Sequence, residues 1–250
     1  MTDVLGYRAK IGLMVPFTNT SVQPEYEAIT PPGVTNHTAR LPNRPRPTHS
    51  DDAYAKVLEE GAVGTEEVID RLTPAEPAAI ILGHSIDSFR GGMDGATALQ
   101  ARLSKHAAIC PVYVPSLALK QAVEVLAAPG CRVSVITPYL KPGGDQACGF
   151  MDDAGFKVMK RKDFCCQSAL AIAAVTEDES RDAIREVDGD DVDAIVQCGT
   201  NMAFQRVAAE AEFFLRKPVL SINTATYWAV LRALGIDDRI RGYGTLLEKH

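Results

Sequence analysis

The sequence has no excess of basic charge and no long apolar run, and these two absences narrow the possible functions. Its 250 residues carry a formal net charge of −6 at pH 7, which argues against a nucleic-acid partner because phosphate binding needs a basic surface. No apolar stretch is long enough to span a bilayer, and the N-terminus does not resemble a secretory signal. We therefore expect a cytoplasmic protein with no membrane partner.

Metal-ligand and nucleotide motifs are also missing. The six cysteines show neither the spacing of a zinc site nor a dense disulfide framework. No Gly-x-Gly-x-x-Gly or Walker sequence is present, so nucleotide binding has little support. We expect reduced thiols and no cofactor. The cysteines lie at positions 110, 131, 148, 165, 166 and 198.

What the chain does contain is a regular alternation of short apolar segments and helical segments. This alternation predicts an α/β fold in which a parallel sheet has helices on both faces. The predicted strands are Ala9–Val15, Val34–Leu41, Ala78–Leu82, Cys110–Val114, Arg132–Thr137, Lys157–Lys160, Asp193–Gln197 and Pro218–Ile222. The predicted helices are Asp52–Arg71, Thr97–Ala107, Leu117–Leu126, Asp145–Asp153, Glu179–Glu186, Met202–Phe214 and Thr224–Leu234.

The two halves of the chain resemble each other. Three pairs of segments match in the same order: Lys10–Pro16 with Arg132–Pro138, Ala79–Gly83 with Ala194–Cys198, and Cys110–Ser116 with Lys217–Asn223. A duplicated half is the better interpretation of three ordered matches. We therefore predict two pseudo-symmetric flavodoxin-like half-domains, residues 1–116 plus 218–250 and residues 117–217, with the active site in the cleft between them. The loops expected to line this cleft are Pro16–Asn19, Gly83–Ser85, Thr137–Tyr139 and Cys198–Asn201.

Cys198 is the most informative single residue. It ends the apolar run of Asp193–Gln197 and begins the turn Cys-Gly-Thr-Asn. Open α/β folds bind ligands at the carboxyl ends of parallel strands, which is where this thiol is predicted to lie. The alternative is a buried structural cysteine, a common fate of this residue type.

Several segments then indicate a family. They are Val15-Pro-Phe-Thr-Asn19 with Glu25 shortly after, Gly83-His-Ser-Ile-Asp-Ser-Phe-Arg-Gly91, Thr137-Pro-Tyr-Leu-Lys-Pro142 and Cys198-Gly199. In this order they resemble the aspartate/glutamate racemase superfamily, within it the branch of arylmalonate decarboxylases and maleate cis-trans isomerases. The resemblance covers nearly the whole chain. It implies that Asn19 and Tyr139 bind a substrate carboxylate and that Cys198 is the catalytic thiol.

One departure from the family pattern matters more than the matches. Racemases and maleate isomerases carry a cysteine in each half, whereas the first-half position here is Gly83. Arylmalonate decarboxylase shows the same combination of one glycine and one cysteine. Its threonine at the next position is His84 here, which leaves the set of hydrogen-bond donors open.

The implied chemistry is the stabilisation of an enediolate. Loss of CO₂ from a malonate, or of a proton next to a carboxylate, places negative charge on two oxygens, and preorganised donors must stabilise it. The predicted donors are the hydroxyls of Ser85 and Tyr139, the side chain of Asn19 and the amides of Ser85 and Gly199. A single thiol then delivers a proton from one face only. Gly83, His84, Thr200 and Asn201 complete the predicted substrate-binding set.

The resemblance supports a cofactor-independent lyase or isomerase acting on a small dicarboxylate. The leading interpretation is an arylmalonate decarboxylase with Cys198 as the proton donor. The first alternative is a maleate cis-trans isomerase in which Cys198 is the nucleophile. The second alternative is a carboxylate-binding protein without catalysis, and whether the chain forms a homo-oligomer stays open.

Two local roles also stay open. Asn201 can cap the helix expected to begin near Met202 or contact substrate, and His84 can be a proton donor or a residue bonded to backbone. Asn223 and Thr224 are expected to cap the last helix.

Overall fold

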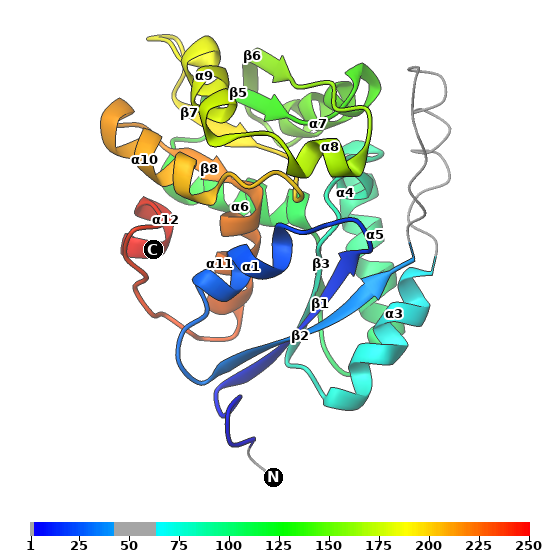
Figure 1. Cartoon of the computed structure of the whole chain (residues 1–250). Helices are drawn as coiled ribbons and strands as arrows, with labels where there is room; N and C mark the ends of the chain where they lie inside the picture. Colours follow the sequence, from blue (N-terminus) through cyan, green and yellow to red (C-terminus); the bar gives the residue numbers. More distant parts are fainter. Residues whose placement is uncertain (1–2, 43–63) are drawn as a thin grey trace.

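Two parallel four-stranded sheets, each flanked by helices, form the framework of the molecule (Figure 1). The computed structural model describes residues 3–42 and 64–250. The first sheet has the order β2-β1-β3-β4 and the second has β6-β5-β7-β8. The strands are β1 Ala9–Pro16, β2 Val34–Leu41, β3 Ala79–Leu82, β4 Val112–Tyr113, β5 Arg132–Thr137, β6 Lys157–Asp163, β7 Ala194–Gln197 and β8 Val219–Ser221.

The two strand orders are the same once the second half is renumbered, so β5 corresponds to β1, β6 to β2, β7 to β3 and β8 to β4. All neighbouring strands in both sheets are parallel. The order 2-1-3-4 is that of flavodoxin-like folds. The predicted fold class, two pseudo-symmetric α/β halves, is confirmed.

The helices connect the strands and cover the sheets. Pro115 and Pro142 stand in the first turns of α6 and α7, where a missing N–H costs no hydrogen bond. A capping box between Thr176 and Glu179 begins α9. The helices are α1 Val22–Ala28, α3 Thr65–Leu72, α4 Ile86–Phe89, α5 Gly92–Ala107, α6 Pro115–Leu126, α7 Lys141–Asp153, α8 Ala169–Ala173, α9 Glu177–Val187, α10 Gln205–Leu215, α11 Ile222–Ala233 and α12 Thr245–Lys249, with a 3₁₀ turn at Thr73–Ala75.

Most predicted helices are present with shifted ends. The helix expected over Asp52–Arg71 lies partly outside the described residues, and its described part belongs to α3. Helices α1, α4, α8 and α12 were not predicted, because elements this short do not display the 3.6-residue period that marks a helix in a sequence.

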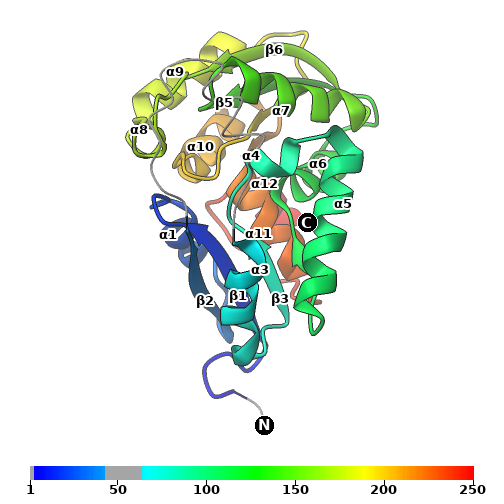
Figure 2. The same ribbon diagram turned by 90° about the vertical axis from the view of Figure 1, so that its right-hand side faces the viewer.

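Strand β8 lies in a different half from the one expected. It pairs with β7 in the second sheet, so Val219–Ser221 does not join residues 1–116 as the predicted division at residue 217 required. The helix that follows does return to the first half, because α11 packs against α1 and α6 and also contacts β3 (Figure 2). The crossing between halves therefore occurs after β8, not before it.

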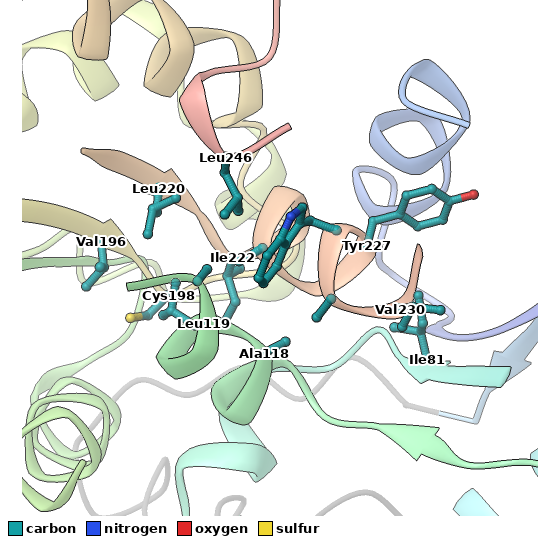
Figure 3. Close-up of a cluster of buried hydrophobic side chains, with 14 of the residues drawn as sticks. Ile81, Ala118, Leu119, Val196, Cys198, Leu220, Ile222, Tyr227, Val230 and Leu246 are labelled. Atoms are coloured by element: carbon teal, nitrogen blue, oxygen red, sulfur yellow. The ribbon is translucent and has the colours of Figure 1, made fainter. Parts of the chain in front are cut away.

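Apolar side chains of α6 and α11 fill the space between the two sheets. The largest buried cluster spans both halves, from Ile81 on β3 to Val196 on β7. Figure 3 shows Leu119 of α6 and Ile222 of α11 between these strands, with Cys198 at the edge of the cluster. The core thus fixes how the strand ends of one half face those of the other. In the described ranges, no helix is long and apolar enough to cross a membrane.

A pair of aromatic rings on α4 and α7 offers a test of how much the core shared by the two halves stabilises the protein. Phe89 and Phe150 are fully buried, and their ring centroids lie 5.5 Å apart at an interplanar angle of 72°. Phe150→Ala should lower the free energy of unfolding by about 3–5 kcal/mol, measured by urea denaturation. The matched control Phe213→Ala, at a side chain that is 78% exposed, should change it by less than about 0.5 kcal/mol. Equal effects would contradict a core that spans both halves.

Candidate active site

Loops from both halves meet where the parallel strands end. Gly83–Ser85 follows β3, Thr137–Tyr139 includes the end of β5 and begins the turn after it, and Cys198–Asn201 follows β7. Hydrogen bonds connect these three loops directly. The carboxyl ends of parallel strands are where such folds place ligand sites, and the sequence-predicted convergence of these loops is present.

Cys198 lies at the centre of this convergence and is fully buried. Its amide donates to the carbonyl oxygen of Ile136 at 2.9 Å, which extends the β5–β7 pairing by one residue. Burial raises the pKa of its thiol well above the ordinary value, and the neighbouring Cys148 and Asp163 raise it further. Cys198 therefore holds its proton at neutral pH.

A directed chain of hydrogen bonds joins the two halves beside this thiol. The Tyr139 hydroxyl donates to the carbonyl oxygen of Cys198 at 2.7 Å. Because that uses the one hydroxyl hydrogen of Tyr139, Ser85 is the donor in the 2.7 Å contact between the two hydroxyls. Ser85 Oγ in turn accepts the amide of Thr200 at 3.1 Å. The chain therefore runs from the Thr200 amide through the Ser85 and Tyr139 hydroxyls and ends on the carbonyl oxygen of Cys198.

Two glycines allow the close approach of backbone in the site. A Cβ at Gly199 would lie 2.4 Å from Cγ of Pro138, so only glycine permits the β5 and β7 loops to pack together. At Gly83, a Cβ would lie 2.9 Å from the carbonyl oxygen of Met14 and 3.2 Å from Cγ1 of Val22. The Gly83 carbonyl accepts the Thr200 hydroxyl at 3.2 Å. Gly83 is thus part of the same network as Cys198.

Of the two roles left open for Asn201, capping the next helix is not the one found, and contact with substrate stays a prediction. Helix α10 begins only at Gln205 and has no side-chain cap at its first residue, so Asn201 does not cap it. Its Oδ1 instead accepts the amide of Thr20 at 2.9 Å, and its Nδ2 donates to the carbonyl of Ala169 at 2.6 Å. Asn201 therefore links the first loop of one half to α8 of the other.

Asn19 is buried beside this link. Its Oδ1 accepts the amides of Ser21 and Val22 at 3.0 and 2.9 Å, which stabilises the turn that leads into α1. Arg40, at the end of β2, donates to the Asn19 carbonyl at 2.7 Å. These bonds fix the Asn19 side chain, and its Oδ1 already accepts two backbone amides.

His84 pairs with Asp87. Its Nδ1 lies 3.0 Å from Oδ2 of Asp87, and 22% of the His84 side chain is exposed. Burial disfavours the protonated ring, but the charge of Asp87 and the hydrogen bond to it outweigh this and raise the His84 pKa. Of the two roles left open for His84, a bond to backbone alone does not describe this contact, and the role of proton donor stays a prediction.

Sequence analysis missed the roles of Glu25 and Asn223. Asn223 was expected to cap α11, but its Nδ2 donates to Oε2 of Glu25 at 2.6 Å and to the carbonyl of Thr200 at 2.9 Å. Glu25 stood in a recognised motif without an assigned role. In the part of the chain that the structure describes, no group of three or more His, Cys, Asp and Glu side chains is arranged to hold a metal ion.

Comparison with known proteins then identifies the family. The family model of arylmalonate decarboxylase matches residues 11–247. This chain belongs to the arylmalonate decarboxylase family. The predicted membership of this group of enzymes is therefore confirmed, and the strand-end network around Cys198 is the candidate active site of a family member.

Maleate isomerases and arylmalonate decarboxylases are both among the proteins similar to this chain. A maleate isomerase from Pseudomonas putida is 26% identical over 95% of this chain and 96% of its own length. The solved maleate cis-trans isomerase of Nocardia farcinica, a cysteine-to-serine mutant with a covalently bound succinylcysteine intermediate, has a TM-score of 0.85 at 23% identity over 97% of this chain and 99% of its own. An arylmalonate decarboxylase with one glycine changed to cysteine and one cysteine to serine has a TM-score of 0.83 at 20% identity over 97% and 100%.

The surroundings of Gly83 give a direct test of the packing in this site. Gly83→Ala should lower the free energy of unfolding by about 1–3 kcal/mol, because the added methyl group meets the backbone oxygen of Met14. Thermal melts measure the change. Gly149→Ala, at a helical position with no atom within 4 Å of the added Cβ, should be neutral or stabilising by up to about 1 kcal/mol. A fully stable Gly83→Ala would show that this loop can move apart without cost.

Proposed function

We propose that this chain is a cofactor-independent isomerase that converts a small cis-unsaturated dicarboxylate of the maleate class into its trans isomer, with Cys198 as the nucleophile. The observation that carries the proposal is the buried thiol of Cys198 at the point where donors of both halves converge. Similarity to maleate isomerases along nearly the whole chain supports this substrate class.

The proposed reaction balances without another reactant. The Cys198 thiol gives its proton to a water molecule, and the thiolate sulfur then bonds to one alkene carbon. The π electron pair moves to the other carbon and into its carboxylate, which gives an enediolate. Rotation about the new single bond follows. The electron pair then re-forms the double bond in the trans geometry and expels the thiolate, which takes up a proton again.

The hydrogen-bond chain beside Cys198 supplies the donors that this enediolate needs. The hydroxyls of Ser85 and Tyr139 carry no net charge, and the Tyr139 hydroxyl, which accepts from Ser85, already donates to the Cys198 carbonyl. On substrate binding, a carboxylate oxygen would replace the Cys198 carbonyl as the acceptor for Tyr139. Asn19 would donate through Nδ2, because its Oδ1 is used in the turn before α1.

A decarboxylase is the second candidate, and two observations favour it. The position equivalent to Cys198 in the first half is Gly83, and burial keeps the Cys198 thiol protonated. In that reaction the bond from the α-carbon to one carboxylate breaks, CO₂ leaves, and the electron pair forms the enediolate. Cys198 then gives its proton to the α-carbon and regains one from water.

Replacing the thiol tests both reactions. Cys198→Ser should abolish turnover of maleate and of 2-aryl malonates, because a serine hydroxyl is far less acidic than a thiol. Dicarboxylate affinity, measured by calorimetry, should stay within about tenfold of wild type, since the carboxylate donors remain. Cys110→Ser, which changes a buried thiol outside the candidate site in the same way, should keep activity. Full activity of Cys198→Ser would contradict every catalytic role given to this residue. Tight binding by wild type without turnover of either substrate would instead indicate a carboxylate-binding protein.

The pH dependence separates the nucleophile from the proton donor. Because the pKa of Cys198 is raised well above its ordinary value, the thiolate is scarce at neutral pH and its fraction grows about tenfold per pH unit. If Cys198 is a nucleophile, kcat/KM for maleate should therefore rise steadily from pH 7 to pH 9. If Cys198 donates a proton, kcat/KM should be flat over this range and fall only above the thiol pKa. A flat profile for maleate would contradict the isomerase mechanism.

A further inference from the structure

Glu25 is a partly buried acid on the first half whose side chain binds backbone of the second half. It lies on α1, and its Oε1 accepts the amides of Phe204 and Gln205 at 3.0 and 2.9 Å. Its Oε2 accepts Nδ2 of Asn223 at 2.6 Å. These partners lie at least 179 residues away in the sequence. We propose that Glu25 is a positioning residue that holds the loop 198–204 in the conformation that the reaction of Cys198 requires.

The two carboxylate oxygens act on opposite ends of this loop. Oε1 anchors the end at Phe204, where α10 begins. Oε2 acts near the beginning through Asn223, whose Nδ2 also donates to the Thr200 carbonyl at 2.9 Å. Thr200 in turn donates its amide to Ser85 Oγ and its hydroxyl to the Gly83 carbonyl. Glu25 is therefore connected, through two intermediates, to the donors beside Cys198.

The location of the acceptor supports a role beyond capping a helix. A side chain of Ser, Thr, Asp or Asn at the first residue of α10 would cap it locally. That residue is Phe204, which has no side-chain acceptor, and the acceptor comes from α1 of the other half. The amides at the start of α10 therefore have this acceptor only when α1 of the first half lies beside them. The same placement of one half against the other sets how far Gly83 and Ser85 lie from Cys198.

The carboxylate of Glu25 has two acceptor oxygens, and they receive three N–H donors. Burial raises the pKa of the carboxyl, and the hydrogen bonds from Asn223, Gln205 and Phe204 oppose this. An amide in place of the carboxylate would keep one acceptor oxygen but turn an N–H₂ group toward Nδ2 of Asn223. Glu25→Gln should therefore preserve the contact with α10 and break the link to Thr200. This makes it a selective variant of nearly unchanged volume.

This inference rests on the proposed function, because its first readout is the rate of that reaction. Glu25→Gln should lower kcat for the substrate turned over by about 10–10²-fold, as expected when catalytic groups are misplaced by about 1 Å, with KM changed much less. Asn223→Ala removes the same link from the other side and should give a similar loss. The double variant should lose little more than either single variant. Glu27→Gln, on the same helix and exposed, is the matched control and should keep wild-type kcat.

A second readout needs no substrate. Mass-spectrometric peptide mapping can follow the alkylation of Cys198 by iodoacetamide in the folded protein. A loosened loop should make this alkylation several-fold faster in Glu25→Gln and Asn223→Ala, and unchanged in Glu27→Gln. If Glu25→Gln fails to fold, Asn223→Ala carries the test alone.

The possible failures can be told apart. Wild-type protein that turns over neither maleate nor 2-aryl malonates would count against the proposed function, whereas faster Cys198 alkylation in the variants would still support the role of Glu25. Wild-type kcat and wild-type alkylation in folded Asn223→Ala would overturn the positioning role. Losses in kcat that multiply in the double variant would overturn it as well, because they would mean that Glu25 and Asn223 act separately.

Discussion

The contact between Thr200 and the Gly83–Ser85 loop is the interaction on which the site depends. Its two hydrogen bonds, amide to Ser85 Oγ and hydroxyl to the Gly83 carbonyl, join strand ends that belong to different sheets. They hold Ser85 beside the Cys198 loop, and Ser85 in turn donates to Tyr139, whose hydroxyl is bonded to the Cys198 carbonyl. The shared core of α6 and α11 makes this contact possible, because it holds the two sheets at a constant distance.

Burial of Cys198 is the main electrostatic constraint on the chemistry. A buried thiol next to Cys148 and Asp163 is held in its protonated form. Such a thiol is a ready proton donor but a nucleophile only after it loses its proton. A dianionic substrate does not by itself favour a thiolate, so an isomerase must supply the missing stabilisation through donors such as Ser85 and Tyr139. The residue of the first half that matches Cys198 in the sequence repeat is Gly83, which supplies no second thiol.

The sequence predicted the parts of the structure that depend on local pattern. The bounds of β2 and β5 were predicted as found, and the matched segments placed Gly83 and Cys198 at equivalent strand ends. The half to which β8 belongs could not be predicted in this way, because an apolar strand of three residues has the same pattern in either sheet. The sheet that a strand joins depends on which distant strand it pairs with, and the local sequence pattern does not contain this information.

The site shows the same limit. Motifs placed Ser85, Tyr139 and Cys198 together, but the partners of Asn201, Asn223 and Glu25 lie far away in the sequence. Asn at the start of a helix suggests a cap, and only the tertiary structure shows that Asn223 donates to the carboxylate of Glu25 on α1, 198 residues away in the sequence. Residues that join the halves are therefore the ones whose roles sequence alone could not give.

Covalent trapping tests the central claim, that the Cys198 sulfur adds to the substrate. Wild-type protein is quenched with acid during turnover of maleate, digested, and mapped by mass spectrometry. The expected result is a thioether adduct of maleate on the peptide that carries Cys198 and on none of the other five cysteines. Turnover of maleate with the adduct on another cysteine, and none on Cys198, would contradict the mechanism.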